Sequence, residues 1–581
     1  NREPSNKALE DIVNSNVSYA VSDAPLFSSI YATRVKWSAP PEHPMSSSLF
    51  VPRNSSEARR CKDHDLWAKA EQKEIQTLRD AALMKLIPPS KQDKDIQVVN
   101  CDFRYRLKTD AEGHVIAHKA RLVILGHQVN RKKANIEPEN CYASVATFAS
   151  LRIIMAIACQ FGWDLDHFDV TGAFLNAKPR RKIYMNQPPG YAHEDKEDWV
   201  AELQKCLYGD PEAGNRWQDL VIESMAKFDA KPIDADPNVY MIAKGKNRIY
   251  TVVWVDDYFV TGNCKNTPLW SDFIKHCNTF FKLNYLGAVS HALGLKVDYD
   301  QAQGTLKISC PAQIDQLVLR NNMQNCTPAA TPAIPEHYVL PDDESEPGED
   351  MRPLVGSGVH LSRTCRPDLS QPANALARVS ANPRKAHDAP KRRYIRYCKG
   401  TRDFGISMHR RQDVQNPVQV FCDSDYAGDH TDRKSTTGIM IQLFGFPVIW
   451  SSKKQPCVSL SSCEAEYIAL CEAGKSALWL YRFLKELQLQ ELTEETLLPI
   501  PIYEDNQSAI HMARNPLNHG RTKHVDVRYH WIREQVKQGV IQLKYKPSDE
   551  QLADLLSKPV SVTVFKKLMS LGFMGNSSSQ P

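Results

Sequence analysis

One stretch of this chain predicts a complete β-hairpin, Ile249-Tyr-Thr-Val-Val-Trp-Val-Asp-Asp-Tyr-Phe-Val-Thr-Gly262. Two runs of β-branched and aromatic residues flank the acidic pair Asp256-Asp257, so we expect both carboxylates at the tip of the hairpin. Two carboxylates held side by side repel each other, and a divalent cation that neutralises them is the most useful reason to keep them together. Aspartate is also common in ordinary surface turns, and the hairpin taken alone favours that simpler interpretation.

A second acidic position lies upstream, in the stretch His167-Phe-Asp-Val-Thr-Gly-Ala-Phe-Leu-Asn176. Asp169 ends a hydrophobic approach there, where a lone aspartate usually caps a helix or closes a turn. Three aspartates from two distant elements, however, form the set that a two-metal phosphoryl-transfer site requires, with the ions about 3.5–4 Å apart. Mg²⁺ takes oxygen ligands and needs few from protein, since water and substrate phosphates supply the others.

Many further segments follow one another in a fixed order along the chain. They are Lys119-Ala-Arg-Leu-Val123, Phe168-Asp-Val170 with Ala173-Phe-Leu-Asn176, Ile183-Tyr-Met-Asn-Gln-Pro-Pro-Gly190, Leu207-Tyr-Gly209 with Trp217, Arg366-Pro-Asp368, Asp423-Ser-Asp-Tyr-Ala-Gly428, Lys434-Ser-Thr-Thr-Gly438, Glu464-Ala-Glu-Tyr467, Thr522-Lys-His524 and Gln551-Leu-Ala-Asp554. With these segments the chain resembles, from about residue 55 to about 575, the reverse transcriptase–ribonuclease H portion of a copia-type (Pseudoviridae-like) LTR retrotransposon Pol polyprotein. The resemblance implies an α+β fold, a right-hand polymerase with fingers, palm and thumb followed by a ribonuclease H-like α/β domain.

The length of 581 residues is too great for one core and predicts three to four domains. Periodic spacing predicts a helix over residues 57–86, and alternation predicts a hairpin from residues 103–107 and 115–125 with a turn at 110–113. By the resemblance we expect a linker or disordered N-terminus over 1–45, fingers and palm over 46–300, a thumb over 301–345, a connection or tether over 346–413, and a ribonuclease H-like domain over 414–581.

Bulk composition excludes several classes of protein. A hydrophobic content of 42% and a charged content of 24% are ordinary for a soluble globular chain, and no apolar run approaches the roughly 20 residues that span a bilayer. Fifteen cysteines without any Cys-x-x-Cys spacing indicate neither a zinc site nor a disulfide framework, and fit a reducing compartment. The N-terminus, Asn-Arg-Glu-Pro, lacks a starting methionine, which leads us to expect a fragment of a longer precursor.

The resemblance also implies a nucleotide pocket. Arg121 would reach the triphosphate of an incoming nucleotide, with Lys108 or Lys119 as a weaker candidate helper, and the alternative is that these cations are simply solvated on the hairpin. Phe174, beside Val170, would exclude a 2′-hydroxyl and so select deoxynucleotides, although a role in core packing is also open. Glu212 would frame the pocket, and Asp210 stands where an apolar residue is usual. Because an unpaired buried carboxylate is expensive, Asp210 must be exposed, partnered or damaging.

The last third of the chain carries a second acidic series. From residue 417 the pattern predicts three strands, a helix, a strand, two helices, a strand and a helix. Asp423 ends the first strand, with Asp425 as an alternative. In the helix over 464–487, Glu466 lies on the apolar stripe, whereas Glu464 is about 200° away and should face water. A carboxylate on a buried face needs a reason, and metal binding supplies one, so Glu466 is preferred.

The series is completed by Asp505, at the end of the strand over 500–504, and by Asp554, on a last helix that we expect to begin with a capping box at Ser548 and Gln551. Each acid alone is more often solvated than catalytic. The ordered quartet of Asp423, Glu466, Asp505 and Asp554 matches the ribonuclease H pattern, which implies hydrolysis of the RNA strand of an RNA–DNA hybrid. Two Mg²⁺ ions, or Mn²⁺, are then expected at each of the two sites.

A basic segment follows the expected polymerase. Between Arg384 and Arg402 lie eight basic residues and a single acid, Asp388. A solvated helix face is the simple interpretation. Within the family the segment could instead track the backbone of a duplex by counterion release, and the cations expected to bind nucleic acid are Lys391, Arg392, Arg393, Arg396 and Lys399.

The resemblance finally implies a function and its setting. We expect an RNA- and DNA-directed DNA polymerase with ribonuclease H activity. Its partners would be an RNA template, a DNA primer and product, RNA–DNA hybrid, dNTPs, a tRNA primer, and the integrase and capsid of the same polyprotein, without a membrane. The expected location is a virus-like particle in the cytoplasm, with access to the nucleus. The alternative is a catalytically decayed or host-adopted relative that only binds nucleic acid.

Overall fold

A computed structural model describes residues 50–109, 115–335, 345–413, 416–514 and 531–572. Helices and strands are mixed along the chain, and the strands form five sheets, so the predicted α+β class is confirmed at this level. The predicted turn at 110–113, the segment Thr522-Lys-His524 and the expected linker over 1–45 lie outside the described residues.

The first described elements differ from the single helix predicted over 57–86. Helix α2 (Ser55–Ala58) and helix α3 (His64–Asp80) are followed by strand β1 (Met84–Ile87). Helix α3 ends because Ala82 takes a left-handed conformation with φ of 50°, which turns the chain into β1. The prediction was therefore wrong after Asp80, where pairing of β1 with a distant strand overrides the helical spacing.

The hairpin predicted from residues 103–107 and 115–125 is confirmed as strands β3 (Cys101–Thr109) and β4 (Val115–Ile124). Phe103 and Leu122 point into a core with Trp67 of α3, and all three side chains are fully buried. Alternation sends the other residues of each strand to the opposite face. That face carries a row of cations, made of Arg104, Arg106 and Lys108 on β3 and Lys119 and Arg121 on β4.

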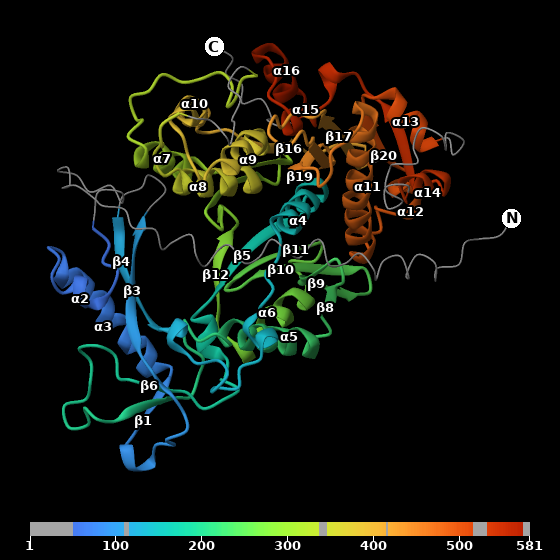
Figure 1. The fold of residues 1–581 in the computed structure, drawn as a ribbon. Helices are drawn as coiled ribbons and strands as arrows, with labels where there is room; N and C mark the ends of the chain where they lie inside the picture. Colours follow the sequence, from blue (N-terminus) through green and yellow to red (C-terminus); the bar gives the residue numbers. More distant parts are fainter. Residues whose placement is uncertain (1–49, 110–114, 336–344, 414–415, 515–530, 573–581) are drawn as a thin grey trace. The chain divides into compact units, whose positions relative to one another are not determined.

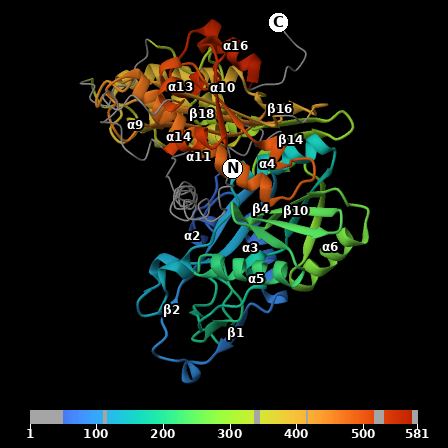
Figure 2. The same cartoon turned by 90° about the vertical axis from the view of Figure 1, so that its right-hand side faces the viewer.

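A six-stranded sheet in the order β12-β5-β11-β10-β9-β8 forms the next region. Its strands are β5 (Asp164–Val170), β8 (Lys231–Ile233), β9 (Asp236–Lys244), β10 (Asn247–Trp254), β11 (Asp257–Gly262) and β12 (Leu283–Ala288). Helix α4 (Phe148–Phe161, cyan in Figure 1) packs against the face that carries Leu165 and Phe259. Helices α5 (Ala213–Lys227) and α6 (Pro268–Phe280) pack against the face that carries Phe168 and Tyr258 (Figures 1 and 2).

The hairpin β10–β11 is confirmed, with one correction to its tip. Trp254 pairs with Asp257, so the two-residue turn is Val255-Asp256 and Asp257 is already the first residue of β11. Val255 adopts a φ of 58°, which is strained for a β-branched side chain. Of the two aspartates, Asp256 therefore lies in the turn, whereas Asp257 belongs to strand β11.

Two further sheets have four strands each, and two strands of the first are inserted in the sequence between β5 and β8 of the six-stranded sheet. The first, β1-β7-β6-β2, adds strands β2 (Val98–Val99), β6 (Tyr184–Met185) and β7 (Val200–Leu203). The second, β13-β14-β15-β16, joins β13 (His291–Ala292), β14 (Leu295–Asp300) and β15 (Thr305–Ser309) to β16 (Gly405–His409). This second sheet crosses the expected limits at residues 301 and 345. Helices fill the interval, α7 (Pro311–Arg320), α8 (Arg352–Thr364), α9 (Ser370–Arg378) and α10 (Asp388–Gly400).

The C-terminal region has the predicted strands and helices in the predicted order, with two helices that the prediction lacked, one before β20 and one after α15. Its five-stranded sheet, β19-β18-β17-β20-β21, contains β17 (Val418–Asp425), β18 (Thr436–Leu443), β19 (Phe446–Lys454), β20 (Ile500–Glu504) and β21 (Ile541–Tyr545). Its helices are α11 (Ser462–Glu486), α12 (Glu494–Leu497), α13 (Gln507–Arg514), α14 (Trp531–Lys537), α15 (Asp554–Ser557) and α16 (Val562–Gly572). β17, β20 and β21 are parallel, whereas β17, β18 and β19 are antiparallel.

Helix α4 connects the six-stranded and five-stranded sheets. Its Arg152, buried at 5% exposure, donates hydrogen bonds to the main-chain oxygens of Val448, Arg363 and Thr364 at 2.8–2.9 Å. The guanidinium also stacks 3.9 Å from the ring centre of Trp450 on β19. One buried cation thus holds the helix, the end of α8 and an edge strand together.

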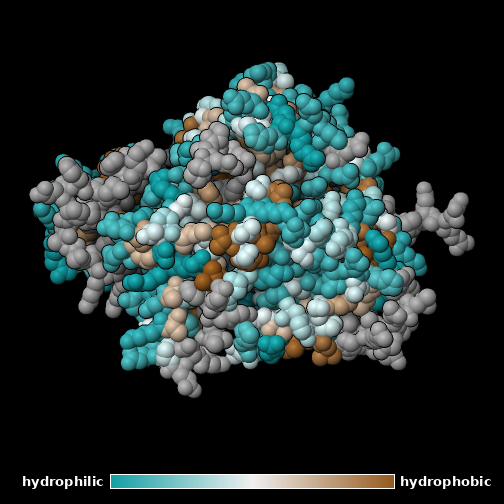
Figure 3. All heavy atoms as spheres, turned by 90° about the horizontal axis from the view of Figure 1, so that it is seen from above, coloured by the Kyte–Doolittle hydropathy of each residue, from teal (hydrophilic) through white to brown (hydrophobic). Residues whose placement is uncertain are grey.

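Among the described residues, the helices are too short or too polar for any of them to be a membrane span. The face drawn in Figure 3 is mostly hydrophilic, with small apolar groups scattered over it.

Two candidate carboxylate sites

The three aspartates of the six-stranded sheet come together at one end of neighbouring strands. Asp169 near the end of β5 is the direct cross-strand partner of Asp257 at the start of β11. The Val170 N–H donates to the Asp256 carbonyl over 2.8 Å, which ties the turn of the hairpin to the end of β5. The proximity that the sequence predicted for Asp169 and the hairpin is therefore present.

These three carboxylates are close but do not form a closed ligand set. Among the described residues, the groups of three acids whose oxygens lie within 4.8 Å of one another are all in the C-terminal region. Asp257 Oδ1 instead lies 2.7 Å from His167 Nε2, and His167 stacks on Phe259. Burial first, and then the Asp257 charge, raises the pKa of both Asp169 and Asp256.

The predicted nucleotide-binding cations lie near these aspartates. Arg121 places its guanidinium 4.6 Å from the ring centre of Tyr208, and the Tyr208 ring contacts that of Phe174 at 4.9 Å. The Arg121 charge opposes the rise in the pKa of Asp256. Burial lowers the pKa of Lys119, and the Asp169 charge opposes this fall. Two cations of the hairpin and two aspartates of the sheet therefore feel one another's charge.

A close approach of two main chains holds Tyr208 in place. The Ile124 N–H donates to the Tyr208 carbonyl over 2.7 Å. Gly209 has a φ of 91°, and a Cβ there would lie 2.0 Å from the Ile124 oxygen. A Cβ on Gly126 would lie 2.1 Å from the Gly209 oxygen. Only glycine fits at both positions, so this crossing fixes the end of β4 against the segment that carries Tyr208.

Asp210 was expected to be exposed, partnered or damaging, and the structure shows that both Asp210 and Glu212 are partnered. Both are buried, and both form an ion pair with Arg181, through Nη2 to Asp210 and through Nε to Glu212 Oε2 at 3.0 Å. Burial raises the pKa of Asp210 to about 6 in spite of Arg181. Sequence reasoning missed Arg181, although the run Arg180-Arg181-Lys182 offered a cation. Val170 is buried behind Asp169, and Phe174 is half-buried.

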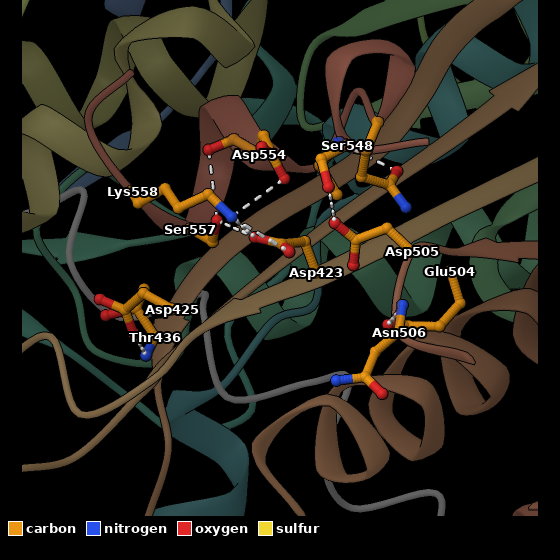
Figure 4. A network of polar contacts seen from close by, with 12 residues as sticks. Asp423, Asp425, Thr436, Glu504, Asp505, Asn506, Ser548, Asp554, Ser557 and Lys558 are labelled. Carbon is orange, nitrogen blue, oxygen red and sulfur yellow. Dashed lines mark hydrogen bonds and ion pairs between the residues drawn. The ribbon is translucent and has the colours of Figure 1, made fainter. Parts of the chain in front are cut away.

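The four predicted acids of the C-terminal region come from four elements. Figure 4 shows Asp423 on β17, Asp505 directly after β20, and Asp554 at the start of α15. Glu466 lies on α11. Asp423, Glu466 and Asp554 are buried, and Asp505 is half-buried. Asp423, Asp505 and Asp554 each place one oxygen within 4.8 Å of the other two. The sequence pattern therefore located a real cluster.

A second set of acids shares Asp505 with the first. Glu466, Glu504 and Asp505 also place one oxygen each within 4.8 Å of one another. Sequence reasoning missed Glu504, although it immediately precedes Asp505. Burial first, and then the neighbouring carboxylates, raises the pKa of Glu466 and Glu504 well above the ordinary value. Glu466 Oε2 is buried without a hydrogen-bond partner among the described residues. Such an oxygen suits a cation, so these carboxylates fit a hard divalent ion such as Mg²⁺ or Mn²⁺.

A lysine lies within the first set. Lys558 Nζ is 3.3 Å from Asp423 Oδ2 and 3.2 Å from Asp554 Oδ1, and the Ser557 hydroxyl donates to Asp423 (Figure 4). Burial and the Asp423 charge raise the pKa of Asp554 to about 8, which Lys558 only partly opposes. The sequence offered the i, i+4 spacing of Asp554 and Lys558 as a signal.

Three details differ from the sequence prediction. Glu464 does not face water, because it is buried and its Oε2 accepts the Leu460 N–H at 2.7 Å. Ser548 does not open a capping box, since it begins a 3₁₀ turn and donates to Asp505 Oδ2 at 2.5 Å (Figure 4). Asp425 accepts the Thr436 N–H and stands outside both carboxylate sets.

Four of the five cations predicted to bind nucleic acid make contacts within the protein. Arg393 donates to Thr331, Arg396 to the Thr327 oxygen, Lys399 to the Cys326 oxygen, and Lys391 pairs with Glu349 and Asp388. They hold neighbouring segments against α10, which sequence reasoning did not foresee. Arg392 is the exposed member of the five. Their role toward nucleic acid stays a prediction.

Comparisons with known proteins give the family. A family model described as reverse transcriptase (RNA-dependent DNA polymerase) matches residues 86–335. The chain is 32% identical, over 86% of its length, to the retrovirus-related Pol polyprotein from transposon TNT 1-94 of Nicotiana tabacum. It is 29% identical, over 91% of its length, to that from transposon RE1 of Arabidopsis thaliana. The chain spans 37% and 35% of these two relatives, about a third of their length.

A shorter relative is matched almost completely. The chain is 30% identical over 309 residues to the putative transposon Ty5-1 protein of Saccharomyces cerevisiae, covering 98% of that protein and 52% of this chain. The resemblance drawn from the motifs is therefore confirmed. The chain belongs to the family of reverse transcriptases found in the Pol polyproteins of copia-type retrotransposons.

Proposed function

We propose that this chain copies RNA and DNA templates into DNA and also degrades the RNA strand of RNA–DNA hybrids. The observation that carries the polymerase is the placement of Asp257 directly opposite Asp169, beside the turn that holds Asp256. The convergence of Asp423, Asp505 and Asp554 supports the ribonuclease H. In this proposal residues 46–300 are fingers and palm, 301–345 thumb, 346–413 connection and 414–581 the ribonuclease H-like domain.

In the polymerase site, the protein binds and orients a nucleotide. Arg121, held over Tyr208, and Lys119 would bind the triphosphate from the cationic face of β3–β4. Phe174 would lie under the sugar and exclude a 2′-hydroxyl, with Val170 beside it. Glu212 acts indirectly in this proposal, since its carboxylate is bound to Arg181. Asp169, Asp256 and Asp257 would hold two Mg²⁺ or Mn²⁺ ions, which would supply activation of the 3′-hydroxyl and charge stabilisation of the leaving pyrophosphate.

In the ribonuclease H site, the protein holds the reacting phosphate against its acids. Asp423, Glu466, Asp505 and Asp554 would bind two divalent ions that supply the activated water and the Lewis acid. Lys558 is half-exposed and lies beside Asp423 and Asp554, so it can reach a phosphate oxygen at the mouth of the site.

The substrates follow from this pair of sites. Element RNA, a tRNA primer, dNTPs and the resulting hybrid would be used in turn to make cDNA. Integrase and capsid of the same polyprotein would be partners in a cytoplasmic particle with access to the nucleus. Lys391, Arg392, Arg393, Arg396 and Lys399 remain the proposed contact with the duplex, with Arg392 the most accessible.

The test uses the purified chain on one RNA template with an annealed DNA primer. With Mg²⁺ the protein should extend the primer and then cut the RNA of the hybrid. Asp257→Asn should reduce extension by about a thousandfold and leave cleavage intact, and Asp423→Asn should do the reverse, because each removes one ion ligand of one site.

Glu464→Gln is the matched control, since Glu464 binds a helix N-terminus rather than a carboxylate set. It should keep both activities. Hybrid binding without extension or cleavage, unchanged by these substitutions, would favour the decayed or host-adopted alternative instead.

A further inference from the structure

Glu504 is a fully buried carboxylate that the proposed chemistry does not yet use. It is the last residue of β20 and lies within 4.8 Å, oxygen to oxygen, of both Glu466 and Asp505. Its Oε1 accepts the Asn506 N–H at 3.1 Å, and its Oε2 lies 3.2 Å from the Cys422 thiol. Glu504 therefore adds a fifth carboxyl group to the four acids of the cluster.

Three carboxylates this close in the protein interior need either shared protons or a cation. Glu466 Oε2 has no hydrogen-bond donor among the described residues, although Glu466 is only 6% exposed. A buried carboxylate oxygen without a donor, on a residue that lies within 4.8 Å of two other carboxylates, is an arrangement that a metal ion satisfies.

The two carboxylate sets also differ in the cation that they already have. We call Asp423, Asp505 and Asp554 the outer set, and Glu466, Glu504 and Asp505 the inner set. Lys558 forms ion pairs with Asp423 and Asp554, which belong only to the outer set. Among the described residues, no salt bridge reaches Glu466, Glu504 or Asp505. A divalent ion at the outer set must compete with an ammonium group, whereas an ion at the inner set meets three carboxylates without such a competitor.

We propose that Glu504 is a metal ligand which, with Glu466 and Asp505, forms an inner divalent-cation position that fills before the outer position of Asp423, Asp505 and Asp554. The inference deepens the proposed ribonuclease H function and rests on it. Its ligands are all carboxylate oxygens, which select Mg²⁺ or Mn²⁺ over softer ions. Asp505 is shared, so the two ions are neighbours, as two-metal chemistry requires.

Mn²⁺ binding to the full chain tests this proposal without any activity measurement. Asp256→Asn and Asp257→Asn are introduced first, so that the polymerase site does not contribute. Titration followed by calorimetry and by the paramagnetic resonance of free Mn²⁺ should then show a tighter and a weaker step. Glu504→Gln should weaken the tighter step by at least about tenfold and leave the weaker one, whereas Asp554→Asn should weaken the second step.

Glu464→Gln is again the control and should leave both steps unchanged. If Glu504→Gln does not fold, Glu504→Asp keeps the charge one carbon further back and should weaken the tighter step by a smaller factor. Unchanged Mn²⁺ binding in Glu504→Gln, together with losses in Asp423→Asn and Asp554→Asn, would overturn the inference but keep the proposed ribonuclease H. No Mn²⁺ bound in this region at all would overturn both.

Discussion

The proposed polymerase site and the C-terminal site both gather aspartates at strand ends, yet the negative charge is compensated differently in the two sites. In the sheet of β5 and β11 the carboxylates stay apart, Asp257 is held by His167, and the cations come from a separate hairpin. In the C-terminal region the carboxylates are packed together, and the cation is Lys558, four residues after Asp554. A site with a built-in cation keeps its shape without a substrate, whereas the open one depends on what enters it.

The largest expected effect of this difference is on the pH dependence of stability. Asp554 has a pKa raised to about 8 in the folded chain, against 3.8 when exposed. A carboxyl group whose pKa is raised by folding stabilises the folded state fully below its unfolded pKa of about 4. This contribution to the free energy of unfolding is lost as the pH rises through the folded pKa of about 8. Calorimetry of the metal-free protein should show the unfolding free energy falling by on the order of 6 kcal/mol over this window, and the raised pKa values of Glu466 and Glu504 act in the same direction.

Saturating Mg²⁺ should remove most of that fall, because the ion replaces the protons. Asp554→Asn should reduce the slope without removing it, because Glu466 and Glu504 keep their raised pKa values, and Asp257→Asn in the proposed polymerase site should leave the slope unchanged. A full slope retained in Asp554→Asn would mean that the crowding of the C-terminal acids is not its source.

Removing the built-in cation should have the next largest effect. Lys558→Met leaves Asp423 and Asp554 without their ion pairs, and should lower the stability of the metal-free chain by about 2 kcal/mol after allowance for the exposed end of the side chain. The same variant should bind Mn²⁺ more tightly at the outer position, as measured by calorimetric titration.

His167→Gln is the matching change in the polymerase site, since glutamine can still donate to Asp257. It should alter stability by less than about 0.5 kcal/mol. Equal losses in the two variants would contradict the view that only the C-terminal site carries its own counter-charge.

The smallest effect is expected at the cationic hairpin. Arg121→Lys keeps the charge but loses the flat contact with Tyr208, and should raise the KM for dNTPs about tenfold, or about 1.4 kcal/mol, with little change in melting temperature. Steady-state primer extension measures it. Arg106→Lys, on the same face of the hairpin, should leave KM unchanged, and an equal rise there would point to general charge rather than to a positioned guanidinium.

The local sequence pattern predicted the strands and helices that carry the acids. It did not predict which side chains form ion pairs with those acids. The hairpin β10–β11 and the elements holding Asp423, Glu466, Asp505 and Asp554 follow from alternation and helical spacing, which depend on neighbours in sequence.

The contacts of Arg181 with Asp210 and of Lys558 with Asp423 join residues 29 and 135 positions apart. Only the fold brings them together, so no local pattern could show them. Glu464 was misplaced because its helical angle was considered without the N-terminus that it caps. The strand β1 was missed because its partner lies more than a hundred residues away.

Arg152 has a consequence for how such chains can diverge. Its hydrogen bonds end on carbonyl oxygens, which every amino acid carries, and only the stacked Trp450 depends on the identity of its partner. The residues whose carbonyl oxygens accept from Arg152 can therefore be substituted without loss of these hydrogen bonds. Tyr250 and Trp479 likewise donate to the carbonyl oxygens of Leu487 and Ala235, so a chimera that borrows its tail from a distant element should stay joined where it keeps these donors and the shared apolar core.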